Sequence, residues 1–133
     1  MIQKNSLIRN FDNSGISVLK CIGVLSNRKE SKILDYIKFS IKKFSKFKKR
    51  RIVKVKKKSI YKGLLITINF FIQRKNGFFI KFDFLKVIGL LNNKMLGTRI
   101  KGNIQKEIKS LIYIKKKNSD LIRKIILKSR YIF

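Results

Sequence analysis

The sequence contains no histidine, proline, tryptophan or alanine, and only six of its 133 residues are acidic. Histidine is the most common general acid or base near neutral pH, so its absence removes the usual group for proton-transfer catalysis. The sequence also has no serine-nucleophile elbow and no phosphate-binding P-loop. The acids form no obvious pair; they are Asp12, Glu30, Asp35, Asp83, Glu107 and Asp120. We therefore predict that the chain is not an enzyme, and we expect no cofactor or metal.

The single cysteine and the short apolar runs exclude two further classes. Cys21 alone cannot form an internal disulfide or a zinc site, and its apolar surroundings favour a buried, inert thiol. The longest uncharged stretch, residues 63–73, is too short to span a bilayer. The N-terminal residues lack the apolar block of a secretory signal. We therefore expect no membrane insertion.

Positive charge is the dominant feature that is present. The chain has 35 lysine and arginine residues and a formal net charge of +29. Charge of this density destabilises a compact fold by self-repulsion unless a polyanion neutralises it. Nucleic acid is the first candidate, because basic proteins bind it by releasing condensed counterions. An anionic membrane surface is the second, but a membrane-active peptide needs one dominant amphipathic helix.

The hydrophobic pattern predicts a single folded domain over residues 1–133, built mainly from β-strands. The 44% hydrophobic content is far above that of a disordered basic tail. Ile37, Phe39 and Ile41 alternate with polar residues, which is typical of a half-buried strand. Two turns are indicated, at residues 12–15 and at residues 74–77, where an Asn-Gly pair favours a tight hairpin. Further strands are predicted at residues 18–25, covered on both faces; at 64–72, with Leu64, Ile66, Ile68, Phe70 and Ile72 inward; and at 78–82, with Phe78, Ile80 and Phe82 inward.

Short strands at regular spacing favour a barrel or a sandwich, and we predict a small β-barrel up to about residue 102. The pattern then changes to two short helices within residues 103–133. Asn103 is predicted to cap the first helix, with Ile104, Ile108 and Leu111 on one face. Asn118 or Ser119 is predicted to cap the second, whose apolar stripe is Leu121, Ile122, Ile125 and Ile126.

A basic arm at residues 42–58 is the strongest candidate for RNA contact. Its ammonium and guanidinium groups can contact phosphates, and Phe44 and Phe47 can either stack on bases or fold back on the barrel. The two turns add Asn13, Ser14, Arg74 and Lys75 as candidates. The predicted contacts from the arm are Lys42, Lys43, Lys46, Lys48, Lys49, Arg50, Arg51, Lys54, Lys56 and Lys57.

Several short motifs follow one another at a specific spacing. They are Met1-Ile2-Gln3, Asp12-Asn13-Ser14-Gly15, Cys21-Ile22-Gly23-Val24-Leu25, Asp35-Tyr36-Ile37-Lys38-Phe39-Ser40-Ile41-Lys42, Gly63-Leu64-Leu65-Ile66, Asn76-Gly77, Ile80-Lys81-Phe82-Asp83, Leu90-Leu91-Asn92-Asn93, Leu96-Gly97-Thr98-Arg99-Ile100-Lys101-Gly102 and Lys106-Glu107-Ile108. Each is weak alone. In this order the set resembles the universal L-fourteen family of large-subunit ribosomal proteins, from residue 1 to about 110 and more loosely to the end.

The resemblance implies a five-stranded barrel with a β-ribbon and C-terminal helices. It also implies binding to large-subunit rRNA at the subunit interface, bridges to small-subunit rRNA, and ribosomal proteins L-three and L-nineteen as neighbours. Members of the family also dock a ribosome-silencing factor. The positions that match its docking surface are Thr98, Arg99 and Lys124.

The composition bears on the origin of the chain. The abundant residues Lys, Ile, Phe and Asn have A/T-rich codons, which is typical of many organellar genes. The resemblance starts at Met1, so no presequence is expected, and both observations favour translation inside an organelle. We therefore expect a mitochondrial matrix location, in the mitoribosome, with a plastid ribosome as the alternative. A basic nucleoid protein or RNA chaperone is the alternative function.

Overall fold

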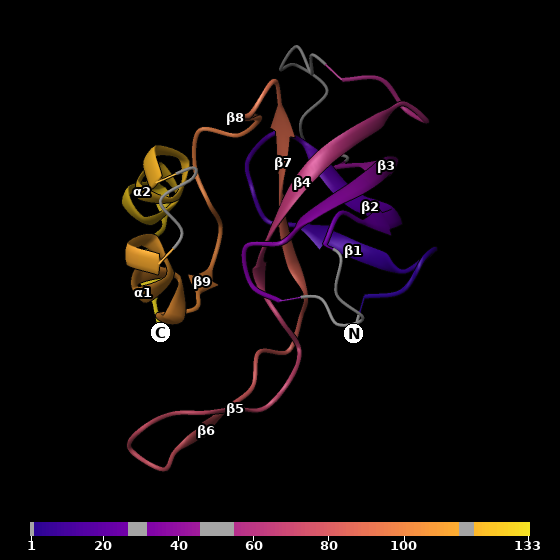
Figure 1. Ribbon diagram of the computed structural model, residues 1–133. Coiled ribbons are helices and arrows are strands. Elements are labelled where there is room, and N and C mark those ends of the chain that lie inside the picture. The colour runs from indigo at the N-terminus through magenta and orange to yellow at the C-terminus, as the bar shows by residue number, and fades with distance from the viewer. Residues whose placement is uncertain (1, 27–31, 46–54, 115–118) are drawn as a thin grey trace.

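The fold is mainly β: a closed barrel of five strands with an extra strand and two short helices near the C-terminus, as predicted. The computed structural model describes residues 2–26, 32–45, 55–114 and 119–133 (Figure 1). Neighbouring barrel strands are antiparallel, except that β1 and β7 pair in parallel and close the barrel. The barrel strands are β1 (Leu7–Asn10), β2 (Ile16–Val24), β3 (Tyr36–Phe44), β4 (Ile60–Thr67) and β7 (Lys86–Leu91), and the extra strand is β8 (Lys94–Met95).

The barrel interior is filled by apolar side chains that alternate along its strands. Leu19, Cys21, Ile37 and Phe39 are completely buried there. Burial raises the pKa of the Cys21 thiol, which agrees with the prediction of an inert cysteine. On β3 the predicted alternation is confirmed, because Ile37, Phe39 and Ile41 are buried and Lys38 is exposed.

A second apolar core lies between the outer face of the barrel and the two helices, α1 (Glu107–Ile114) and α2 (Ser119–Lys128). Figure 1 shows both helices together on one side of the molecule, beyond β8. Leu64, Ile66 and Ile88 of β4 and β7 belong to this core, whereas Leu65 of β4 points into the barrel. The β4 strand is therefore buried on both faces.

This arrangement corrects two predictions. Residues 64–72 do not form one alternating strand, because β4 ends at Thr67 and Phe70 is exposed. The doubly covered strand is β4 and not the one at residues 18–25, since β2 has several half-buried positions. The physical reason is that the helices cover β4 and β7, so these strands lose the polar outer face of a half-buried strand.

Both helices predicted within residues 103–133 are present, and Ile104, Ile108 and Leu111 of the first predicted apolar face belong to the second core, but the predicted start of the first helix is wrong. Ile122 and Ile125 of α2 are buried, and Leu121 and Ile126 pack beside them, which confirms the apolar stripe. Asn103 does not cap α1. It lies in β9 (Asn103–Ile104), which pairs in parallel with β10 (Tyr131–Ile132), so α1 starts only at Glu107. Within the part of the chain that is described, no helix has the length and apolarity to cross a membrane.

The predicted hairpin at residues 74–77 is confirmed. It joins β5 (Ile72–Gln73) to β6 (Phe79–Ile80), and Gly77 has the positive φ of 79° that the turn requires. Figure 1 shows the hairpin as a two-stranded ribbon that extends away from the barrel. Phe78, predicted to face inward, is instead largely exposed at its tip, whereas Phe82 at its base is buried.

Candidate RNA and partner interface

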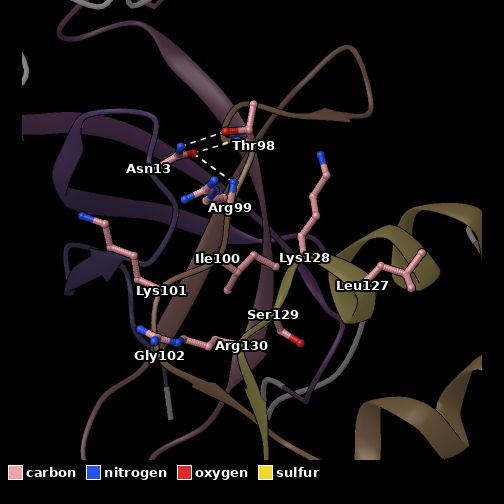
Figure 2. A pocket seen from close by; sticks show the side chains of 10 residues that line it. All are labelled: Asn13, Thr98, Arg99, Ile100, Lys101, Gly102, Leu127, Lys128, Ser129 and Arg130. Atoms are coloured by element: carbon pink, nitrogen blue, oxygen red, sulfur yellow. Dashed lines mark hydrogen bonds between the residues drawn. The ribbon is translucent and has the colours of Figure 1, made fainter.

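Two loops far apart in the sequence form one surface. The turn at residues 12–15 lies against the loop at residues 97–102, and Asp12 forms a β-bridge with Ile100. The Asn13 side chain joins them (Figure 2). Its Oδ1 accepts hydrogen bonds from the backbone N–H groups of Thr98 at 2.7 Å and Arg99 at 3.1 Å. Its Nδ2 donates to Thr98 Oγ1 at 2.8 Å.

The turn that carries Asn13 is itself held by a buried carboxylate. Asp12 is 2% exposed, and its Oδ1 accepts hydrogen bonds from Asn10 Nδ2 at 2.5 Å, from the Ser14 N–H at 2.9 Å and from the Ser14 hydroxyl. Gly97 completes the contact, because a Cβ at that position would lie 2.6 Å from Asp12 Cβ. A side chain at residue 97 would push the two loops apart.

The end of α2 adds the other side of the surface. The Ile100 N–H donates to the Lys128 carbonyl at 3.2 Å, which fixes the loop to the last turn of the helix. Between them lies an open hollow of about 1060 Å³ (Figure 2). Four cations and no acid line it: Arg99, Lys101, Lys128 and Arg130. We call these four residues the cationic hollow. It is chemically suited to a phosphate group or an acidic side chain.

The sequence-predicted docking residues are only partly brought together. Thr98 and Arg99 are exposed at the cationic hollow, whereas Lys124 lines a neighbouring, smaller hollow beside β8. Lys128, one helical turn after Lys124, borders both hollows. Lys128 is not among the site residues predicted from the sequence. Its i, i+4 spacing from Lys124 on a helix is the signal that could have identified it.

The predicted RNA-binding residues of the arm divide into two groups. Lys42 and Lys43 at the start of the arm, in β3, and Lys56 and Lys57 near its end are exposed. Phe44 is half-buried and packs against the barrel core, which is the fold-back alternative for that ring. Outside the described residues lie Phe47 and the remaining predicted contacts Lys46, Lys48, Lys49, Arg50, Arg51 and Lys54.

The turn residues proposed for RNA contact have internal roles as well. Asn13 holds the Thr98–Arg99 backbone, and the Ser14 hydroxyl bonds to Asp12. At the hairpin, Arg74 Nε forms a 2.9 Å ion pair with Glu107 of α1, and Lys75 is exposed. RNA contact by these four residues stays a prediction.

One buried cation lies next to this surface. Lys86 at the start of β7 is 8% exposed, and its Nζ donates to the Asn103 carbonyl at 2.8 Å and lies 4.7 Å from the centre of the Phe11 ring. Burial lowers the pKa of this ammonium group, and the nearby Asp83 carboxylate partly opposes the shift. Lys86 therefore fixes β7 to β9 and is not available to a partner. In the described ranges, no three potential metal ligands lie together.

We expect the substitution Asn13→Ala to lower the free energy of unfolding by about 1–3 kcal/mol, because two backbone N–H groups lose their acceptor. Asn13→Asp keeps an oxygen for both N–H groups and should cost clearly less. Urea unfolding followed by circular dichroism measures both variants. Equal losses would show that the acceptor oxygen does not hold the loop.

Comparison with known proteins gives two findings. The family model described as "Ribosomal protein L14p/L23e" matches residues 1–121. The large ribosomal subunit protein uL14 of Carsonella ruddii (strain PV) is 37% identical over 113 residues, which cover 83% of this chain and 88% of that protein. The match spans the barrel, the loop at residues 97–102 and α1.

Proposed function

Since this chain belongs to the ribosomal protein L14p/L23e family, we propose that it is a structural constituent of the large ribosomal subunit that binds large-subunit rRNA and helps to form inter-subunit bridges. The family consists of structural ribosomal proteins and not of enzymes, as the missing histidine led us to expect. The whole chain, residues 1–133, acts in this proposal as one domain, with a barrel to about residue 102 and a helical part from about residue 103.

The observation that carries the RNA-binding proposal is the combination of a +29 charge with a surface where cations gather without acids. The cationic hollow and the exposed Lys42, Lys43, Lys56 and Lys57 offer ammonium and guanidinium groups to phosphates. The A-form helix of RNA hides its major groove, so these contacts favour phosphates, 2′-hydroxyl groups and shape over sequence.

The partners follow from the same membership. We assign large-subunit rRNA to the arm and the turns, and small-subunit rRNA to the bridge-facing residues Thr98, Arg99 and Lys124. Ribosomal proteins L-three and L-nineteen are the proposed protein neighbours. A ribosome-silencing factor is the proposed transient binding partner at Thr98 and Arg99. The fixed backbone of these two residues supports this assignment, because a loop held by Asn13 presents its side chains in one arrangement.

We place the protein in an organellar ribosome, in the mitochondrial matrix, with a plastid ribosome as the alternative. The support is compositional, from the excess of residues with A/T-rich codons. The similar protein from Carsonella ruddii is bacterial; family membership supports the ribosome as the location, and the organelle is proposed from composition.

Sedimentation tests the proposal against the alternative of a basic nucleoid protein or RNA chaperone. The tagged chain is expressed in its native cell, and lysates are separated on a sucrose gradient in the presence of magnesium. We expect it to migrate with large subunits and to stay there after DNase treatment. A chain that remains in a DNA fraction, or in free RNA without subunits, contradicts the ribosomal role.

We expect Arg99→Ala to weaken subunit joining or silencing-factor binding about 10- to 150-fold, the effect of losing one charge-assisted hydrogen bond. The barrel should remain folded, because Arg99 is exposed. Joining of purified subunits and binding of the purified factor are the measurements. The control is Arg123→Ala, which removes an exposed arginine of α2 away from the hollow. Unfolding of the Arg99 variant would instead indicate a structural role.

A further inference from the structure

The β5–β6 hairpin has two faces of different character. Exposure alternates along both halves of the hairpin. Phe71 and Gln73 are exposed before the turn, and Phe79 and Lys81 are exposed after it. Between them Ile72, Arg74 and Ile80 are half-buried and Phe82 is buried. Successive residues of a strand point to opposite faces. The four exposed residues therefore share one face, which we call the outward face.

The opposite face is partly occupied within the molecule. Arg74 lies on it and forms the ion pair with Glu107 at the first turn of α1. This pair links the hairpin to the helical part and neutralises the cation of that face. The outward face is turned away from this contact, and its four residues are exposed to an external partner.

The outward face alternates aromatic and polar groups across the two strands. Gln73 pairs with Phe79 in the ladder, and Lys81 Nζ lies 5.0 Å from the centre of the Phe71 ring. The Phe71 and Phe79 side chains are 69% and 63% exposed, and none of the four residues is acidic. This is not a continuous apolar surface of the kind that packs into a protein groove, because each ring has a polar neighbour.

We propose that the outward face of the β5–β6 hairpin binds unpaired RNA nucleotides, with Phe71 and Phe79 stacking on bases. The Gln73 amide lies beside the rings where it can donate to and accept from a base edge, and Lys81 supplies the charge for a phosphate. The positive charge of Lys81 complements the phosphate chain of RNA, and the rings complement bases that are not stacked in a duplex. The inference rests on the proposed rRNA-binding function and specifies the kind of rRNA segment at this position: a loop, bulge or single strand.

The test compares two RNA probes on the full chain. One is a single-stranded oligouridylate of about 12 nucleotides, whose bases are free to stack on protein, and the other is an RNA duplex of the same length. We expect the double variant Phe71→Leu/Phe79→Leu to bind the single strand at least about 5-fold more weakly, because a base stacked on an aromatic ring contributes about 5- to 150-fold in affinity. Duplex affinity should not change. The salt dependence of single-strand binding should also keep its slope, since no ionic contact is removed.

Phe78→Leu is the matched control. Phe78 is 72% exposed and lies next to Phe79 at the tip, where strand alternation directs it away from the outward face. The Phe78→Leu variant should bind the single-stranded RNA with the affinity of the unchanged protein. An equal loss for Phe78→Leu would overturn the assignment to one face. Melting curves of all variants should coincide, because the substituted rings are exposed.

The other outcomes distinguish a failure of base stacking at the hairpin from a failure of the proposed rRNA-binding function. If the unchanged protein binds both RNAs and the double variant loses nothing, stacking is wrong and the ribosomal role stands. If RNA affinities are unchanged but the double variant no longer enters large subunits, the face docks on a protein and the inference fails. If the unchanged protein binds neither RNA, the proposed rRNA-binding function itself fails.

Discussion

Raising the salt concentration from 50 to 200 mM is expected to weaken binding of this protein to isolated large-subunit rRNA by about 10³- to 10⁵-fold. Such a loss corresponds to about six to ten neutralised phosphates on the scale measured for duplex DNA. The reason is the release of condensed counterions, which becomes less favourable as bulk salt rises. Filter binding or fluorescence anisotropy over a salt series measures the slope of log affinity against log salt.

Removing defined cations should reduce that slope in steps. The triple variant Lys42→Gln/Lys56→Gln/Lys57→Gln removes three exposed ammonium groups of the arm. Each lost phosphate contact should lower the slope by roughly 0.7–0.9. Lys86→Gln is the control, because Lys86 is buried and contacts the Asn103 carbonyl instead of a partner. A salt-independent affinity would contradict charge-driven binding.

Phe39→Ala is expected to have the largest effect on stability, a loss of about 3–5 kcal/mol in the free energy of unfolding. The Phe39 ring is completely buried in the barrel, where it covers Gly63 of β4 and Gly89 of β7. A Cβ at Gly63 would lie 2.9 Å from Phe39 Cε1, and one at Gly89 would lie 3.5 Å from Phe39 Cζ. Since small proteins are stable by about 5–15 kcal/mol in total, the variant should be partly unfolded at physiological temperature. Urea unfolding at fixed salt measures the loss.

A double variant tests the reason for the Phe39 effect. Gly63→Ala alone should cost about 1–3 kcal/mol, because the new methyl group would collide with Phe39 and Val87. Combined with Phe39→Leu, part of this cost should disappear, since the smaller side chain leaves room for the methyl group. Phe78→Ala, at an exposed ring, should change stability by no more than about 0.5 kcal/mol. Strictly additive losses for the pair would show that ring and glycine do not share the same space.

Features with local causes could be predicted from the sequence. Asn76-Gly77 gives a hairpin because Gly77 adopts positive φ cheaply, and the alternation at residues 37–41 gives a half-buried strand because side chains alternate between faces. The stripe of α2 follows from helical periodicity in the same way. These patterns depend only on neighbouring residues, and the fold class emerges from their sum.

Features that depend on residues far away in the chain could not be predicted from the sequence. The double burial of β4 depends on helices that come some fifty residues later, so its pattern alone could not separate a buried strand from an alternating one. Asn103 has the chemistry of a helix cap, but pairing with Tyr131 draws it into a strand. Tertiary pairing overrides local preference at this position.

The candidate interface also depends on contacts between residues that are far apart in the chain. Asn13 was predicted as an RNA contact because turn residues are exposed, yet its amide bonds to Thr98, 85 residues away. Nothing near Asn13 in the sequence indicates that partner. The Arg74–Glu107 pair, which covers one face of the hairpin, also joins distant residues, 33 positions apart in the chain.

The parallel pairing of β1 with β7 has a consequence for how the protein is synthesised. Arg9 pairs with Lys86, so more than half of the polypeptide must emerge from the translating ribosome before the barrel can close. Until then the nascent chain carries unpaired strand edges beside dense positive charge, a state prone to aggregation and to premature capture by RNA. Such long-range closure is slow. The helices are synthesised after β7. They therefore dock on a barrel that is already closed, as the last step of its folding.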